Sequence, residues 1–380
     1  MNTALQDALR EDAVHPQAET AMRPLRLAVY RGAIAAARFT DPQTELSALR
    51  AGCGVYDLGF RGRISLTGGD RQRWLNGMVT NNIRDLAPEH GVYAFLLNPQ
   101  GRILGDLYAF NRGESIIVDT DRSQLEKILA TFDHFIIMDD VEVNNLSASI
   151  TALGIAGPKA RVTLQRAGIT IPDLDPLQVL TPKCECQCDC LECTVVRGED
   201  VKHESYEIWV APNGVKQLWN ALLAAGATAV GSEALETQRI LSGVPLYGVD
   251  IRERDLPQET EQTRALNFNK GCYVGQEIVE RIRSRGAVHR KFAGFVVEGG
   301  GSVVPGARII VGDKEAGEIT SATSLQVAGA ERTAALGYIR REVGVPGREV
   351  LIGMAKATVS QLPFDETTSF RDQPSMATQV

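Results

Sequence analysis

The chain has 380 residues, of which 44% are hydrophobic and 23% charged, with 36 glycines and 16 prolines. This length exceeds what one ordinary hydrophobic core needs, so it predicts a globular protein of two or three domains with many turns. The formal net charge of -7 excludes a protein that coats nucleic acid nonspecifically.

The N-terminal residues 1–15 include acidic side chains and lack the basic start and apolar core of a signal peptide. No stretch of the sequence approaches the roughly 20 uninterrupted apolar residues of a membrane span. We therefore expect a cytoplasmic protein with no membrane partner. Its 7 cysteines are better explained in that compartment as thiols or metal ligands than as disulfides.

Residues 1–39 are weakly patterned and predict an N-terminal arm with a short strand or helix near 25–39. Residues 40–145 predict a first α+β domain, in which a strand, a Gly-Gly turn and a helix follow one another and a later Pro-Gly turn joins a hairpin. The expected elements are a short helix before Gly52, strand 64–67, a helix carrying Trp74, hairpin strands 92–97 and 102–110, strand 116–118, helix 123–132 and strand 141–143.

Residues 146–290 predict a second α+β domain that begins with a similar order of elements. Its expected elements are strand 150–155, a helix through Gln165, strand 205–210 and helices 215–225 and 232–241. Residues 291–364 carry short β runs between glycine and proline turns, which predicts a small β-barrel or sandwich domain. Residues 365–380 are polar and predict a flexible tail.

The most distinctive stretch is Lys270-Gly271-Cys272-Tyr273-Val274-Gly275-Gln276-Glu277. Glycines on both sides of Cys272 allow a sharp turn, and apolar residues at helical spacing after Gly275 place the cysteine just ahead of a helix. The positive end of that helix and the neighbouring Lys270 would both favour the thiolate. The alternative is a buried cysteine that acts as a small hydrophobic residue.

This stretch resembles the signature of the YgfZ family, folate-binding proteins related to the glycine-cleavage T-protein, which is an aminomethyltransferase that lacks the cysteine motif. The likeness extends over residues 40–364. It implies an α+β fold of three domains in a ring around a central folate channel, a small C-terminal β-barrel domain, and tetrahydrofolate as the cofactor. Further family-like runs are 55–58, 62–64, 80–83, 98–107, 243–250 and 336–338.

The resemblance implies that Glu207 receives the pterin ring of folate, and that Arg239, upstream of a Gly-x-Pro-x-Tyr-Gly run, belongs to the same site. A carboxylate within a strand of large apolar residues needs a partner, which supports Glu207 independently. The alternatives are a strand-edge carboxylate and a helix-surface arginine. The other folate-binding candidates are Tyr206, Tyr273, Gln276 and Glu277.

Three residues are catalytic candidates: Cys272, Lys270 and Asp106. The T-protein carries Asp-Asp-Leu after its hairpin turn, and an aspartate there assists transfer of the aminomethyl group to folate. This chain has Gly105-Asp106-Leu107 instead. Asp106 is therefore also explained as ordinary hairpin polarity.

A cysteine cluster between Pro182 and the strand at 194–197 has no counterpart in the family. A coiled loop would bind zinc, copper(I) or an iron–sulfur cluster through thiolates, whereas an extended loop would hold the sulfurs too far apart for one ion. The alternative is a solvated loop insertion. The cluster consists of Cys184, Cys186, Cys188, Cys190 and Cys193.

Three functions follow from these residues. The YgfZ resemblance implies a folate-dependent accessory protein for iron–sulfur cluster assembly or repair, whose partners are assembly proteins or client enzymes. The T-protein resemblance implies a tetrahydrofolate-dependent aminomethyl- or methyltransferase. A metal-binding module built on the cysteine cluster would leave most of the chain unexplained. The Cys272 motif and the incomplete Asp-Asp pair favour the first.

Overall fold

The computed structural model describes residues 1–12, 24–182, 192–200, 204–286, 288–298, 303–327 and 330–364. These residues form two compact units. The first contains Met1–Leu235 and Thr263–Glu277, and the second contains Glu236–Gln262 and the chain from Ile278 onward. Within the described residues, no helix combines the length and apolar character needed to cross a membrane.

The N-terminal residues are more structured than their weak pattern predicts. Helix α1 (Ala4–Asp12) buries Leu5 and Leu9 in the core of the first unit. Strands β1 (Arg26–Tyr30) and β2 (Ala33–Arg38) then form a small antiparallel sheet. The first part of the expected arm is therefore a helix packed on the core, because two leucines on one of its faces are buried there.

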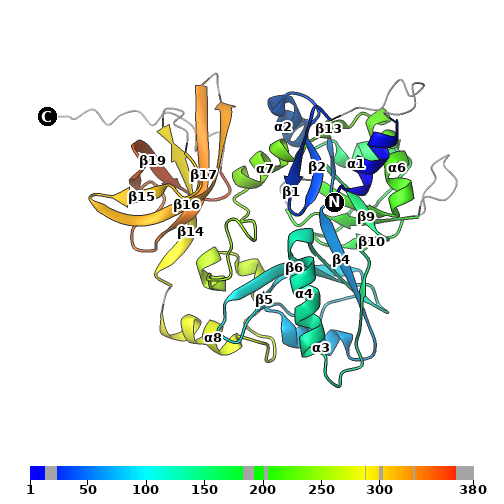
Figure 1. Ribbon diagram of the computed structural model, residues 1–380, viewed down its shortest axis with the longest axis horizontal. Coiled ribbons are helices and arrows are strands. Elements are labelled where there is room, and N and C mark those ends of the chain that lie inside the picture. Colours follow the sequence, from blue (N-terminus) through cyan, green and yellow to red (C-terminus); the bar gives the residue numbers. More distant parts are fainter. Residues whose placement is uncertain are drawn as a thin grey trace. The chain divides into compact units, whose positions relative to one another are not determined.

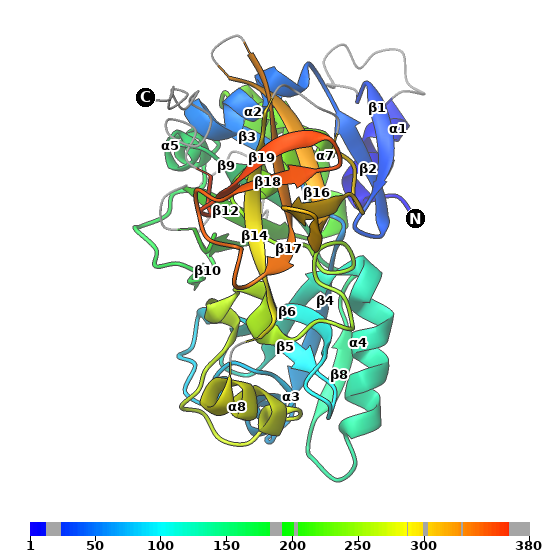
Figure 2. The same cartoon turned by 90° about the vertical axis from the view of Figure 1, so that its left-hand side faces the viewer.

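The first sheet of this unit has the strand order β5-β6-β7-β4-β8. Helices α3 and α4 pack on it, and α4 contributes Ile128 and Phe132 to the core (Figure 2). The expected hairpin forms with Leu96 opposite Gly105. The elements are β4 (Arg61–Thr67), α3 (Arg71–Met78), β5 (His90–Leu97), β6 (Ile103–Asn111), β7 (Ile116–Asp121), α4 (Arg122–Phe135) and β8 (Glu142–Asn145).

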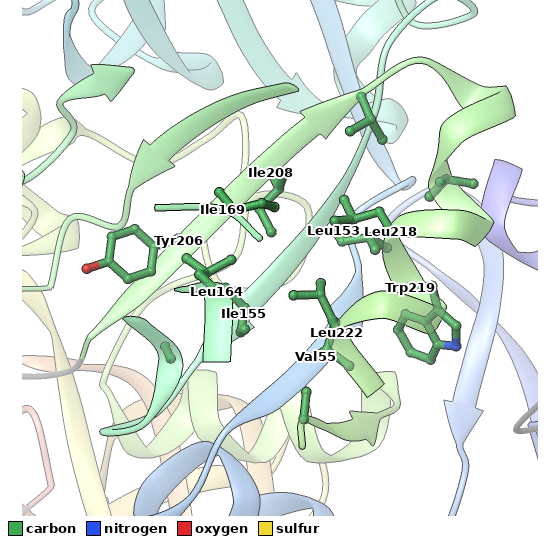
Figure 3. Close-up of a cluster of buried hydrophobic side chains, with 14 of the residues drawn as sticks. Val55, Leu153, Ile155, Leu164, Ile169, Tyr206, Ile208, Leu218, Trp219 and Leu222 are labelled. Atoms are coloured by element: carbon green, nitrogen blue, oxygen red, sulfur yellow. The ribbon is translucent and has the colours of Figure 1, made fainter. Parts of the chain in front are cut away.

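The second sheet has the order β10-β11-β12-β9-β3-β13, and its β3–β13 pair is parallel. Its core contains Tyr206 and Ile208 from β12 together with Trp219 from α6 (Figure 3). The elements are α2 (Pro42–Ala51), β3 (Gly54–Asp57), β9 (Thr151–Ala156), α5 (Ala160–Arg166), β10 (Val179–Leu180), β11 (Cys193–Arg197), β12 (Ser205–Val210), η1 (Pro212–Gly214), α6 (Val215–Ala224) and β13 (Thr228–Val230).

The second unit contains the closed barrel β14-β17-β16-β15-β18-β19 (Figure 1), which confirms the expected C-terminal β-barrel. Its strands are β14 (Arg290–Val297), β15 (Arg308–Val311), β16 (Lys314–Val327), β17 (Ala330–Arg340), β18 (Glu349–Ile352) and β19 (Ala355–Ser360). The remaining elements of the chain are α7 (Ser232–Leu241), η2 (Pro257–Thr260), η3 (Thr263–Ala265) and α8 (Gln276–Arg285).

The units divide the chain differently from the expected boundaries at residues 145 and 290. Part of the expected second domain, residues 236–262, belongs with the barrel. Ion pairs connect this stretch to the barrel, because Arg290 of β14 pairs with Asp255 at 2.7 Å and with Glu259 at 3.0 Å. Such pairings between distant parts of the chain leave no local signal in the sequence.

Candidate functional site

A cavity of about 180 Å³ lies within the first unit, with walls from both of its sheets. The two sheets pack face to face nearby, where Phe110 and Ile117 of one lie in the same apolar cluster as Val196 and Trp209 of the other. The cavity is lined by Arg31, Leu58, Phe60, Arg61, Tyr108, Phe110, Leu177, Val196, Arg197, Gly198, Glu199 and Glu207. A mainly apolar wall with a few charged groups is the usual character of a small-molecule site.

Glu207 is the predicted site residue that lines this cavity. Its side chain is 30% exposed, and Trp209 Nε1 donates a hydrogen bond to Oε2 at 2.9 Å. The Arg63 guanidinium lies 3.7 Å from the same oxygen. Burial raises the pKa of Glu207 and nearby Asp119 raises it further, whereas Arg63 opposes the change. Oε1 has no hydrogen-bond partner within the described residues, so it can accept one from a ligand.

Tyr206 lies on the other face of β12 from Glu207. Successive side chains of a strand point to opposite sides, and Tyr206 is buried in the core shown in Figure 3. Its hydroxyl donates to Glu204 at 2.7 Å. The alternation of the strand therefore places Tyr206 and Glu207 on opposite faces of the sheet, and a folate contact of Tyr206 stays a prediction.

Several charged residues near the cavity escaped the sequence analysis. Arg61 Nε donates to Asp119 at 3.2 Å and its Nη1 to Asp121 at 2.6 Å. Arg63, on the same strand, is completely buried. A signal was present, because two acidic residues at the end of the apolar strand β7 require cations nearby.

Asp106 is held by two side chains. Tyr93 Oη donates to its Oδ2 and Gln124 Nε2 to its Oδ1, each at 2.7 Å. Burial raises the pKa of this carboxyl, and the charge of Asp121 adds to the effect. Asp106 does not line the cavity of Glu207. Its catalytic role stays a prediction, and these contacts also suit a structural carboxyl.

The segment that carries the cysteine motif is fastened to the chain between α3 and β5. Thr80 Oγ1 donates to the Ala265 carbonyl at 2.6 Å, and Asn267 N donates to the Thr80 carbonyl at 3.0 Å. Cys272 is exposed in the loop before α8, which begins at Gln276. Its position ahead of a helix and its exposure therefore agree with the sequence analysis, and its chemical role stays a prediction.

Lys270 serves as an anchor for this segment. Its Nζ donates to the backbone carbonyls of Asn76, Val79 and Asn81, each at 2.6 Å. Burial lowers the pKa of this amine to about 7. Three acceptors require the three N–H donors of the ammonium form. These hydrogen bonds give Lys270 an anchoring role in the segment, and its predicted catalytic role stays a prediction.

The other motif candidates make local contacts. Tyr273 is buried beneath Lys270, whose Nζ lies 5.0 Å from the ring centroid. Gln276 Oε1 accepts from the Tyr273 backbone N–H at 3.3 Å, and Glu277 is exposed. None of the three lines the cavity of Glu207. The structure therefore does not bring them together with Glu207 as the resemblance implied.

Arg239 belongs to the second unit, and its guanidinium donates hydrogen bonds to residues of that unit. Nη1 donates to Asp250 at 2.6 Å and to the Val244 carbonyl at 2.5 Å, and Nη2 donates to Glu236 at 2.5 Å. Its side chain is only 5% exposed. These contacts hold Arg239 within this unit, and its predicted folate contact stays a prediction.

Cys193 begins strand β11 and is buried in the apolar core. Residues two apart on a strand lie on the same face, and Val195 of β11 is buried in the same core as Cys193. Within the described residues no group of His, Cys, Asp or Glu side chains could hold a metal ion. Cys184, Cys186, Cys188 and Cys190 lie outside the described residues.

The model of the GCVT N-terminal domain matches residues 11–270. The chain belongs to this family. The match includes Glu207 and ends at Lys270, so Cys272 lies just beyond the part that GCVT domains share.

Two relatives of this chain align with it over most of its length. An aminomethyltransferase of Rubrobacter xylanophilus is 30% identical over 89% of this chain and 90% of its own. A putative chloroplastic transferase of Arabidopsis thaliana is 27% identical over 86% of this chain and 74% of its own.

The crystal structure of the glycine cleavage system aminomethyltransferase T from Bartonella henselae superposes with a TM-score of 0.78. It covers 92% of this chain and 100% of the other, with 20% identity. The expected T-protein-like fold is therefore confirmed, while the central folate channel stays a prediction.

Proposed function

We propose that this protein is a YgfZ-type, folate-dependent accessory factor for iron–sulfur cluster assembly or repair in the cytoplasm. The proposal rests on Cys272, which is exposed on a loop. Lys270 holds this loop in place through hydrogen bonds from its amine to three backbone carbonyls. A loop built in this way presents a thiol to another protein. The partners would be iron–sulfur assembly proteins or the enzymes that receive the cluster.

The folate part of the proposal rests on Glu207 and on family membership. Tetrahydrofolate carries a pterin ring with N–H donors on one edge, and the Glu207 carboxylate has Oε1 available for such donors. The cavity of about 180 Å³ with apolar walls suits a flat heterocycle. Arg197, which lines the cavity and donates to the backbone carbonyl of Ser205, adds positive charge there that suits an anionic ligand.

Tetrahydrofolate binding is tested by the melting temperature of the protein with and without the ligand. We expect Glu207→Gln to reduce the ligand-induced stabilisation, because an amide only partly replaces a carboxylate that accepts from N–H donors. The expected loss of binding free energy is about 1.5–3 kcal/mol. Equal ligand-induced shifts for both proteins would reject this role of Glu207.

A second candidate function is aminomethyl transfer to tetrahydrofolate. It is favoured by the Rubrobacter relative, which is named an aminomethyltransferase and matches almost the whole chain. Asp106 is the carboxyl that this reaction would use. Its two oxygens accept from Tyr93 and Gln124, and a second lone pair on each oxygen can accept from a substrate.

The two functions are separated in cells that carry Cys272→Ala in place of the native protein. We expect iron–sulfur enzymes to lose activity while glycine cleavage continues. Cys190→Ala serves as the matched control and should leave both activities intact. Loss of glycine cleavage with intact iron–sulfur enzymes would instead establish the transferase, and an effect of Cys190→Ala alone would point to metal binding by the cysteine cluster.

A further inference from the structure

Arg63 is a buried cation without hydrogen bonds from its guanidinium. Its side chain is 0% exposed, and Nε, Nη1 and Nη2 have no hydrogen-bond partner within the described residues. Burying a charged group in this way is costly unless another charge compensates it. Such a residue therefore points to a function that requires its charge.

The surroundings of Arg63 show where that charge acts. Its guanidinium lies over the Trp209 ring, 4.7 Å from the centroid, and 3.7 Å from Glu207 Oε2. Trp209 donates its indole N–H to the same oxygen. Arg63 comes from β4 and the other two residues from β12, so the three groups meet where the two sheets of the first unit face each other.

We propose that Arg63 and Trp209 are positioning residues, which hold the Glu207 carboxylate by Oε2 and leave Oε1 to accept an N–H from the ligand. The inference rests on the proposed folate binding and deepens it. It predicts selection for a heterocycle that presents an N–H donor to Oε1. A ligand that offers an acceptor at that place would meet a negative oxygen.

The charge balance around Glu207 explains why this support is needed. Burial and Asp119 both disfavour the charged carboxylate. Arg63 and Arg61 both favour it, and the effect of Arg63 is the larger of the two. Arg61 also pairs with Asp119 and Asp121. The titratable, charged and hydrogen-bonding groups near Glu207 are Tyr56 of β3, Arg61 and Arg63 of β4, Asp119 of β7 and Trp209 of β12, together with Arg31, Arg197 and Glu199, which line the same cavity.

The test measures tetrahydrofolate affinity against pH for Trp209→Phe, which keeps an aromatic ring on Arg63 but removes the N–H. We expect the acid-side loss of affinity to move to higher pH by about one unit or more. Trp219→Phe is the matched control, because the Trp219 indole N–H is buried without a partner among the described residues. The amide in Glu207→Gln does not titrate. The pH dependence of affinity that remains in this variant therefore does not come from Glu207, and it includes the titration of the ligand itself.

Arg63→Met should move the profile in the same direction, and Arg63→Lys should restore part of the native profile because it keeps the charge. A Trp209→Phe profile that coincides with those of the native protein and Trp219→Phe would overturn the inference, as would an unchanged profile for Arg63→Met.

Carbon-13 NMR titration of the Glu207 carboxyl, assigned by its disappearance in Glu207→Gln, provides a readout without ligand. If the native protein fails to bind tetrahydrofolate, the folate proposal fails. The Glu207 carboxyl would still titrate at higher pH in Trp209→Phe if the positioning role is correct, and an unshifted titration would refute it.

Discussion

Asp57 is a buried carboxyl at the end of β3, and the partly exposed Arg122 lies near enough to act on its charge. It accepts hydrogen bonds from the Thr3 hydroxyl and, at 2.7 Å, from the Gly59 backbone N–H. Burial raises the pKa of Asp57 to about 6, against the opposing effect of these hydrogen bonds. The folded protein therefore takes up a proton at this carboxyl more readily than the unfolded chain does.

The sign of the resulting pH dependence follows from linkage. A raised carboxyl pKa contributes stability that is complete below the unfolded pKa of about 4 and is lost as the pH rises through the folded pKa. We expect the free energy of unfolding of the native protein, relative to Asp57→Asn, to fall by on the order of 2–3 kcal/mol across this interval. Denaturant titrations of both proteins at several pH values measure it. A constant difference would show that Asp57 has an ordinary pKa.

At the scale of elements, the cysteine loop depends on its contact with the β5–β6 hairpin. Gly275 has a φ of 82°, and a Cβ added there would lie 2.6 Å from the carbonyl oxygen of Asn98. Real Cβ atoms essentially never approach a backbone oxygen so closely. Gly271 lies in the same motif, and no heavy atom of the described residues would lie within 4 Å of its added Cβ.

We expect Gly275→Ala to destabilise the first unit by more than the about 1–2 kcal/mol that a left-handed backbone costs a residue with a Cβ. The displaced loop should also change the rate at which Cys272 is alkylated. Gly271→Ala should behave nearly as the native protein in both measurements, which are denaturant unfolding and the alkylation rate. Similar effects of the two substitutions would mean that the hairpin contact does not hold the loop.

At the scale of the whole molecule, the two units have separate hydrophobic cores. Phe132 of α4 belongs to a core of the first unit, and Phe295 of β14 belongs to the barrel core. Both side chains are completely buried. The cores share no side chain within the described residues, so each unit should respond to damage in its own core.

We expect Phe295→Ala to destabilise the barrel unit by about 3–5 kcal/mol, and Phe132→Ala to do the same to the first unit. Hydrogen exchange followed by mass spectrometry should show lost protection in β14–β19 for the first variant and in β4–β7 for the second. Each variant serves as the control for the other, because its own substitution lies in the core of the other unit. Loss of protection throughout the chain in both variants would show that the units unfold together.

The sequence alone determined those features that depend on neighbouring residues. The Asn98-Pro99-Gln100-Gly101 turn predicts the β5–β6 hairpin. The glycines on both sides of Cys272 and the apolar residues at helical spacing after Gly275 predict an exposed cysteine ahead of α8. The resemblance over residues 40–364 also predicted the T-protein-like fold, and the superposition on the Bartonella henselae aminomethyltransferase confirms that fold. Turn chemistry and periodicity act over a few residues, so they are visible in the sequence.

Only the tertiary structure decided which side chains meet. Arg63 and Glu207 are distant in sequence, and their contact depends on how two sheets face each other. The sequence predicts a catalytic role for Lys270 from its place near Cys272, whereas only the structure shows that its amine donates to carbonyls at and just after the end of α3. Strand alternation placed Tyr206 and Cys193 in the core. Such contacts arise because packing brings distant segments together, and no local pattern of residues specifies them.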